Sequence, residues 1–236
     1  MLVLDDVQYT YQRERFRFDL TIEQGQIVSL MGPSGAGKST LLALVAGFIH
    51  PDRGDIRVDG ESIVCQEPYL RPFSMLFQEY NLFAHLSVRD NIGLGLHPGL
   101  KLTVEQQRQV EQAAQQVGIA EYLNRLPEQL SGGQRQRVAL ARCFVQSHSI
   151  WLLDEPFSAL DPVLREEMLK LVKKLAIERG VTVLMVTHHV SDTKAIASHF
   201  VFVADGKVEA TGDMSALSEQ YASEKLAAFI RAASEC

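Results

Sequence analysis

The sequence predicts an α/β fold built on a mostly parallel β-sheet with helices on its faces. Short β-like runs alternate with helical patterns along the chain, which is the order typical of such sheets. Three runs, at residues 150–153, 181–186 and 200–203, are almost continuously apolar, as expected of central strands covered on both faces. At ~150 residues per domain, 236 residues fit one domain with a subdomain, so we expect residues 1–236 to form a single domain.

Composition excludes several classes of protein. Hydrophobic residues make up 46% and charged residues 22% of the chain, close to the averages of globular proteins, which argues against disorder and collagen-like repeats. The longest apolar run, residues 41–49, is far shorter than the ~20 residues of a membrane-spanning helix. The N-terminus has neither the basic nor the apolar region of a signal peptide. We therefore expect a cytoplasmic protein.

Charge and cysteine content narrow the possible partners. The net charge of −6 argues against nonspecific binding to nucleic acid or anionic lipid, because both require a basic excess. Association with a membrane would then depend on a protein partner. Cys65, Cys143 and Cys236 include no close pair, which indicates a reducing compartment and no structural zinc site.

The N-terminal part differs from the rest in its pattern. Residues 2–8, 16–22 and 55–59 are short, rich in β-branched and aromatic residues, and separated by turn sequences such as residues 23–25 and 59–60. We expect a small antiparallel β subdomain there.

Helical patterns follow in the middle and at the end of the chain. Residues 103–118 predict a helix with Thr103 as its N-cap and Gly118 as its stop, within a helical subdomain at about residues 82–148. A later helix has one apolar face, formed by Leu164, Met168, Leu171, Val172 and Leu175. A short helical tail is expected at about residues 213–236.

A phosphate-binding loop is the first motif that carries chemistry. The pattern G-x-x-x-x-G-K-[ST] lies between the expected strand 27–31 and the expected helix 38–48. Its glycines allow backbone N–H groups to surround a phosphate at the positive end of the helix. Lys38 can reach the β- and γ-phosphates of ATP, and the Ser39 hydroxyl can ligate Mg²⁺. The alternative is a glycine-rich turn without a ligand. The loop comprises Gly32, Pro33, Ser34, Gly35, Ala36, Gly37, Lys38, Ser39 and Thr40.

Two carboxylates follow the apolar run at residues 150–153. Asp154 and Glu155 would lie at the carboxyl edge of the sheet, where open α/β folds bind their ligands. Asp154 would hold Mg²⁺, and Glu155 would orient or deprotonate the water that attacks the γ-phosphate. Taken alone, the pair could merely begin a turn.

A second motif, LSGGQ, precedes a helical pattern. Ser131, Gly132, Gly133 and Gln134 would form another phosphate cradle at a helix N-terminus. One nucleotide does not need two cradles within one chain. We therefore expect a head-to-tail homodimer, in which each ATP lies between the phosphate loop of one subunit and the LSGGQ of the other.

With these motifs the chain resembles the ATP-binding subunits of ABC transporters over about residues 2–215. The resemblance implies a P-loop ATPase with a RecA-like, mostly parallel sheet, a small antiparallel β subdomain and an α-helical subdomain. It further implies that Gln78 links the γ-phosphate and Mg²⁺ to the surface that receives the membrane subunit. His188 would contact the γ-phosphate, with His189 as the alternative, and Asp161 would act across the dimer.

The adenine contact is a further implication of the resemblance. Tyr11 looks like the aromatic residue that stacks on adenine, a contact worth ~1–3 kcal/mol by analogy with base stacking. Tyr9 is the alternative, and a structural tyrosine is the competing interpretation of both.

The resemblance also implies a transport role. The stretches RPFSMLFQEYNLFAHLSVRDNIGLGLHPGLKL and LSGGQRQRVALARCFV are most similar to those of subunits that drive thiamine import. Ferric ion, polyamine and molybdate are the alternative solutes. Expected partners are a permease of two copies or two halves, at the cytoplasmic face of the inner membrane, and indirectly a periplasmic substrate-binding protein.

Other classes with a phosphate loop are less consistent with the sequence. A soluble ABC ATPase of translation or repair usually has two cassettes or a long coiled coil, a non-hydrolysing module would lack Glu155, and a small-molecule kinase would not need LSGGQ. Because the helical tail after residue 213 is short, we expect no C-terminal regulatory domain.

Overall fold

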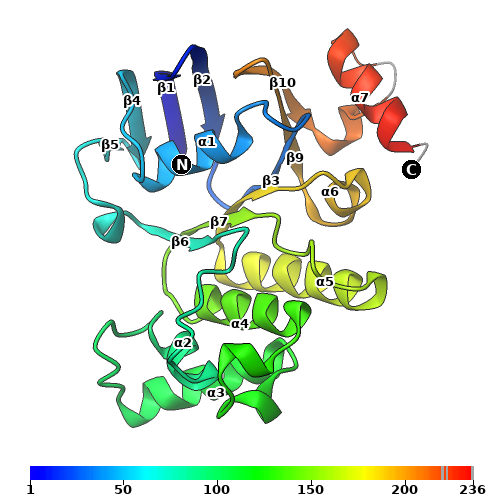
Figure 1. Cartoon of the computed structure of the whole chain (residues 1–236). Coiled ribbons are helices and arrows are strands. Elements are labelled where there is room, and N and C mark those ends of the chain that lie inside the picture. Colours follow the sequence, from blue (N-terminus) through cyan, green and yellow to red (C-terminus); the bar gives the residue numbers. More distant parts are fainter. Residues whose placement is uncertain (219–220, 222, 235–236) are drawn as a thin grey trace.

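One mixed β-sheet organises the molecule. The computed structural model describes residues 1–218, 221 and 223–234. Within them the strands follow the order β5-β4-β1-β2-β10-β9-β3-β8-β7-β6 (Figure 1). The strands are β1 (Leu2–Tyr11), β2 (Glu14–Ile22), β3 (Ile27–Met31), β4 (Arg53–Val58), β5 (Glu61–Ser62), β6 (Phe73–Leu76), β7 (Ile150–Asp154), β8 (Thr182–Val186), β9 (His199–Ala204) and β10 (Lys207–Asp213).

The parallel half of the sheet brings the expected site residues to one edge. Strands β9, β3, β8, β7 and β6 are all parallel neighbours. Val186 is paired with Leu30 on one side and with Asp154 on the other. Strands β3, β7 and β8 therefore end at the same level, and the loops that follow them start side by side.

The antiparallel half is continuous with the parallel half. β1 pairs with β2 and β4, and β4 pairs with β5, all antiparallel. A single parallel pair, Lys207 with Arg17, joins β10 to β2. The antiparallel β subdomain is thus an extension of one twisted sheet rather than a separate layer.

Two strands lie where the sequence pattern is weak. β6 has only four residues, and β10 reads KVEATGD, which lacks both the apolar run of a central strand and a clean alternation. Both were missing from the expected elements. Each is specified by its neighbour, because β6 pairs with the buried β7 and β10 with the buried β9.

Helices cover the two faces of the parallel strands. Alternate residues of β7 belong to two different cores: Ile150 and Leu152 pack with α1, whereas Trp151 and Leu153 pack with α4 and α5. In Figure 1, α5 and α4 lie below the strands and α2 and α3 lie beyond them. The helices are α1 (Lys38–Ala46), α2 (Val88–Gly93), α3 (Val104–Gln116), α4 (Gly132–Phe144), α5 (Pro162–Arg179), α6 (Val190–Ile196) and α7 (Glu224–Ser234).

The ends of α3 follow the predicted signals. Thr103 Oγ1 accepts a hydrogen bond from Gln106 N, and Gln106 Oε1 accepts one from Thr103 N, which is a capping box. Gly118, with φ of 66°, lies just past the helix, in the left-handed conformation that favours glycine. Helices α2, α3 and α4 lie within residues 82–148, the expected helical subdomain.

The C-terminal tail contains α7, which packs on β9 through Leu226 and Ile230. Residues 219, 220, 222, 235 and 236 of the expected tail, including Cys236, lie outside the described residues. Across the described part of the chain, no helix combines the length and apolar character needed to cross a membrane.

Candidate nucleotide site

A cleft of about 640 Å³ opens at the carboxyl edge of the parallel strands. It brings together residues that are far apart in sequence, from the β1–β2 hairpin to the loop after β8. The lining includes Tyr9, Tyr11, Phe16, Ser34, Gly35, Gly37, Lys38, Ser39, Thr40, Gln78, Glu155 and His188.

Two glycines of the phosphate loop have steric reasons to be glycine. A Cβ on Gly32, whose φ is 146°, would lie 2.0 Å from the backbone oxygen of Val203. A Cβ on Gly37, whose φ is 102°, would lie 2.7 Å from the Phe16 ring. The loop is therefore pressed against β9 and β2, and Gly37 directly precedes the first residue of α1. This places the N-terminus of α1 at the cleft, where its dipole favours an anion.

Lys38 lies at the centre of the loop and is almost fully buried. Its Nζ donates hydrogen bonds of 2.8 Å to the carbonyl oxygens of Gly32 and Pro33. Burial lowers the pKa of Lys38, and the charges of Glu155 and Asp154 oppose that shift. The ammonium group is thus held between loop carbonyls and carboxylates, in a position to contact a phosphate bound by the loop.

Asp154 is suited to hold a metal ion. Its carboxyl group is buried, and Oδ1 has no hydrogen-bond partner among the described residues. Burial raises the pKa of Asp154, and a hydrogen bond with Ser39 opposes the shift. A buried acceptor beside a serine hydroxyl fits Mg²⁺, which takes oxygen ligands, commonly one or two carboxylates together with substrate phosphates and water. Gln78 lines the same cleft and offers a further oxygen.

Glu155 and His188 meet at the edge of the cleft. Glu155 Oε1 lies 2.7 Å from His188 Nε2. Glu155 follows β7 and has a φ of 48°, an uncommon conformation for a non-glycine residue. Its N–H donates to the carbonyl of Val186, which extends the pairing of β7 with β8. One more hydrogen bond to β8 therefore follows the end of β7, and the backbone then bends at Glu155.

His189 points elsewhere than His188. The two rings are 6.5 Å apart and at 69° to each other. His189 lines a small neighbouring pocket with Thr187 and Asp192, and the residues lining the nucleotide cleft do not include it.

The two tyrosines occupy different positions in the cleft wall. Tyr11 is 56% exposed at the end of β1. Tyr9 is half-buried, and its ring stacks on Phe16 at 6.3 Å between centroids. Tyr11 therefore presents the free aromatic surface, whereas Tyr9 is held by its neighbours.

The LSGGQ residues and Asp161 do not reach this cleft within one chain. Ser131 is the N-cap of α4: its Oγ accepts a hydrogen bond from Gln134 N, and Gln134 Oε1 accepts one from Ser131 N. Asp161 caps α5 by accepting hydrogen bonds from Val163 N and Leu164 N. The side chains of Ser131, Gln134 and Asp161 thus have a local structural role.

Sequence reasoning did not single out Arg142 in α4. Its guanidinium group donates hydrogen bonds of 2.7 and 2.8 Å to the carbonyl oxygens of Tyr80 and Asn81. Both of those residues have positive φ, so the loop after Gln78 is held in an unusual conformation by the helix that begins with LSGGQ. A partly buried arginine on a helix gives no such signal in the sequence alone.

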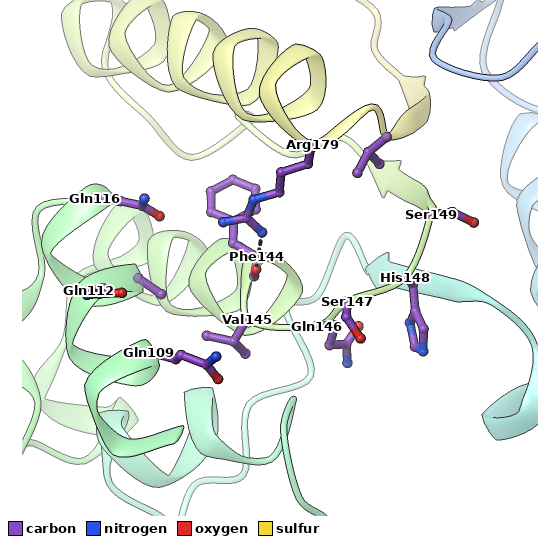
Figure 2. Close-up of a pocket in the computed structure, with 12 residues that line it drawn as sticks. Gln109, Gln112, Gln116, Phe144, Val145, Gln146, Ser147, His148, Ser149 and Arg179 are labelled. Atoms are coloured by element: carbon purple, nitrogen blue, oxygen red, sulfur yellow. Dashed lines mark hydrogen bonds between the residues drawn. The ribbon is translucent and has the colours of Figure 1, made fainter. Parts of the chain in front are cut away.

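A second cavity lies at the opposite edge of the sheet. It has a volume of about 510 Å³ between α3 and the C-terminal ends of α4 and α5 (Figure 2). Ser149 and Val181, which precede β7 and β8, line it, and none of its lining residues is a carboxylate or belongs to a motif above. The cavity is therefore separate from the nucleotide site.

Comparison with known proteins decides the family. The family model described as ABC transporter matches residues 16–158 of this chain. The chain belongs to the ABC transporter ATP-binding family. As an ABC ATPase it binds ATP, and the cleft described above is the candidate site for that nucleotide.

Curated relatives of this ABC ATPase agree over nearly its whole length. It is 84% identical over 233 residues to the thiamine import ATP-binding protein ThiQ of Vibrio parahaemolyticus, covering 99% of this chain and 100% of the relative. It is 67% identical to ThiQ of Vibrio cholerae, covering 99% of this chain and 98% of the relative.

A solved ABC cassette has the same fold. The chain is similar to a dimeric, post-hydrolysis structure of the ATP-binding cassette MJ0796 bound to ADP and Pi, with a TM-score of 0.82 and 30% identity. The match covers 91% of this chain and 99% of the other. The α/β class and the ABC ATPase fold expected from the sequence are confirmed.

Proposed function

We propose that this chain is the ATP-hydrolysing subunit of a bacterial thiamine importer, acting as a single ATPase domain. The observation that carries the hydrolytic part is the meeting of Lys38, Glu155 and His188 in one cleft. The solute is supported by the identity with thiamine import proteins over almost the entire chain. Ferric ion, polyamine and molybdate have no support from these relatives.

The phosphate loop positions ATP for hydrolysis. Its backbone N–H groups and Lys38 bind the phosphates, and Lys38, Ser39 and Thr40 form the first turn of α1. Tyr11 offers its exposed ring to the adenine base. These groups bind and orient ATP so that the γ-phosphate points toward Glu155.

Glu155 orients the attacking water and takes up its proton, since a carboxylate in hydrogen-bond reach of the water acts as a general base. His188 holds that carboxylate in place through the 2.7 Å contact and contacts the γ-phosphate. Asp154, Ser39 and Gln78 would hold Mg²⁺, which offsets the charge that develops on the phosphate oxygens during transfer.

A head-to-tail homodimer completes the site. Ser131, Gly132, Gly133 and Gln134 lie away from the cleft of their own chain, and their helix N-terminus would approach the phosphates of the partner's ATP. Asp161 lies on the loop beside them and would act across the same interface. The dimeric state of the MJ0796 cassette supports the formation of a dimer.

The membrane partner would dock beside Gln78. Phe83, in the segment that follows, is 49% exposed, and Arg142 fixes the loop between them. The partner would be a permease of two copies or two halves at the cytoplasmic face of the inner membrane, with a periplasmic substrate-binding protein acting indirectly. The net charge of −6 disfavours nucleic acid as a partner.

Uptake in cells tests the proposal. Cells lacking this chain should lose ATP-dependent uptake of labelled thiamine, and the wild-type chain should restore it while Lys38→Ala should not. Excess unlabelled thiamine should compete, whereas ferric ion, spermidine and molybdate should not. Undiminished uptake in cells that lack the chain would contradict the proposal.

A further inference from the structure

Gln136 connects the helix of the LSGGQ motif to the loop of the catalytic carboxylate. Its side chain is fully buried in the second turn of α4. Nε2 donates a hydrogen bond of 3.2 Å to the carbonyl oxygen of Glu155, and Oε1 accepts one of 3.2 Å from Ala159 N. One amide therefore holds both ends of the loop from Glu155 to Ala159, which leads to Asp161.

The Glu155 carbonyl depends on such donors. Glu155 has a φ of 48°, and a strained conformation of this kind persists only when surrounding contacts hold it. The same carbonyl oxygen accepts hydrogen bonds from the N–H and the hydroxyl of Ser158 at 3.4 and 3.3 Å. Gln136 supplies the donor that comes from outside the loop.

The glycines of LSGGQ lie against the same loop. A Cβ on Gly133 would lie 3.2 Å from the carbonyl oxygen of Ala159, and one on Gly132 would lie 3.8 Å from the Ala159 side chain. The first turn of α4 thus packs directly on the loop that Gln136 bonds. A shift of either element must move the other, because this contact is both close and hydrogen-bonded.

The other end of α4 is also held. Arg179 Nη1 donates a hydrogen bond of 2.6 Å to the carbonyl oxygen of Phe144, the last residue of α4 (Figure 2). Arg142 binds the loop after Gln78. α4 therefore has hydrogen-bonded contacts near both ends, and Gln136 supplies those to the catalytic loop.

We propose that Gln136 is a positioning residue that couples two ATP sites: it sets Glu155 for the ATP of its own subunit and LSGGQ for the ATP of the partner. This proposal rests on the proposed function, because the roles of Glu155 and LSGGQ come from it. Gln136 touches neither nucleotide. It acts on both sites through the Glu155–Ala159 loop.

The first test is Gln136→Met, which retains the length of the side chain but removes the donor and the acceptor. The homodimer should hydrolyse ATP at least ~10-fold more slowly, since small misplacements of a catalytic group reduce rates by up to about 100-fold. The fall in kcat should exceed any change in the KM for ATP, because Lys38 and the phosphate loop, which hold the nucleotide in its own chain, are untouched. Wild-type kcat would overturn the proposal, as would a loss confined to KM.

Heterodimers purified through two different affinity tags test separately the two proposed effects of Gln136, on Glu155 and on LSGGQ. A Gln136→Met subunit paired with Lys38→Ala has one competent loop, served by the altered chain's Glu155. A wild-type subunit paired with the double variant Lys38→Ala, Gln136→Met has one competent loop, served by the altered chain's LSGGQ. Both should be slower than wild type paired with Lys38→Ala. A loss in only one heterodimer would overturn the coupling and leave a local role.

A matched control removes another buried side-chain to backbone hydrogen bond. Thr182 Oγ1 accepts from Gly25 N at the opposite edge of the sheet, so Thr182→Val should lower the melting temperature but retain wild-type kcat. Equal loss of kcat in this control would assign the Gln136→Met effect to stability and overturn the proposal. A different result would contradict the proposed ATPase function itself: full ATPase activity in the Lys38→Ala homodimer.

Discussion

Glu155 Oε1 and His188 Nε2 lie 2.7 Å apart, although the two residues follow different strands. Their contact exists because β7 and β8 are parallel neighbours with Asp154 opposite Val186. The Glu155 side chain is 13% exposed and that of His188 is 48% exposed. The carboxylate is thus enclosed, while the imidazole can still reach a ligand in the cleft.

The first prediction concerns Glu155→Gln. This variant should bind ATP with wild-type affinity, because Lys38 and the loop are unchanged, but its rate of phosphate release should fall by at least ~100-fold, as expected for loss of a general base. Size-exclusion chromatography with ATP should show a stable dimer. Glu178→Gln, at an exposed position on α5, is the control and should behave as wild type. A monomeric Glu155→Gln variant with normal hydrolysis would refute the role.

Asp154 offers a test that depends on pH. Burial raises the pKa of this carboxyl above the unfolded value of about 3.9, so its ionised form destabilises the folded state. Asp154→Asn should therefore raise the melting temperature at pH 7.5 in buffer without nucleotide or magnesium. The gain should shrink as the pH falls through the raised pKa and vanish below the unfolded value.

The same variant should lose ATP hydrolysis, because a neutral amide lacks the negative charge with which the Asp154 carboxylate would hold the metal. Asp19→Asn, on the exposed face of β2, is the control and should change neither property. If Asp154→Asn instead lowered the melting temperature at every pH, burial of the charge would not be the dominant effect.

Exposed aromatic surface near Gln78 predicts the docking site. A photo-crosslinking amino acid in place of Phe83 should capture the permease in intact membranes, detected by mass spectrometry. The same substitution at Ile177, which is 67% exposed at the far end of α5, is the control and should capture none. Equal capture from both positions, or none from Phe83, would be inconsistent with docking at this segment.

The cysteines differ in their expected reactivity. Burial raises the pKa of the Cys143 thiol to about 12, so almost no thiolate forms at pH 8, whereas Cys65 is exposed. Iodoacetamide at pH 8 should modify Cys65 in the native protein and Cys143 only after unfolding in urea, as measured by peptide mass spectrometry. Rapid native modification of Cys143 would contradict its burial.

Local signals made much of the site predictable from sequence. The phosphate loop could be located because Gly32, Gly37 and Lys38 have their chemistry within a few consecutive residues. Asp154 could be placed because an apolar strand ends directly before it. The N-cap of α3 is predictable at Thr103 for the same reason, since a threonine directly before a run of helix formers is a local signal.

Contacts between residues that are far apart in the sequence could not be predicted from the sequence pattern. The sequence pattern of residues 207–213 does not predict a strand. β10 forms there because this segment pairs with β9. Gln136 lies only two residues after LSGGQ, yet its importance comes from Glu155 and Ala159, which approach it through folding. His188 and His189 are adjacent in sequence, and only the loop conformation after β8 distinguishes the one that faces the cleft.

The most direct test of the central claim, that one ATP is handled by two subunits, mixes two inactive variants. Lys38→Ala removes the phosphate-loop ammonium, and Ser131→Arg blocks the LSGGQ turn. Each homodimer should be inactive, but the mixed dimer should regain about one competent site, because one interface then combines an intact loop with an intact LSGGQ. ATP hydrolysis that stays at the background of the two homodimers would contradict the head-to-tail arrangement.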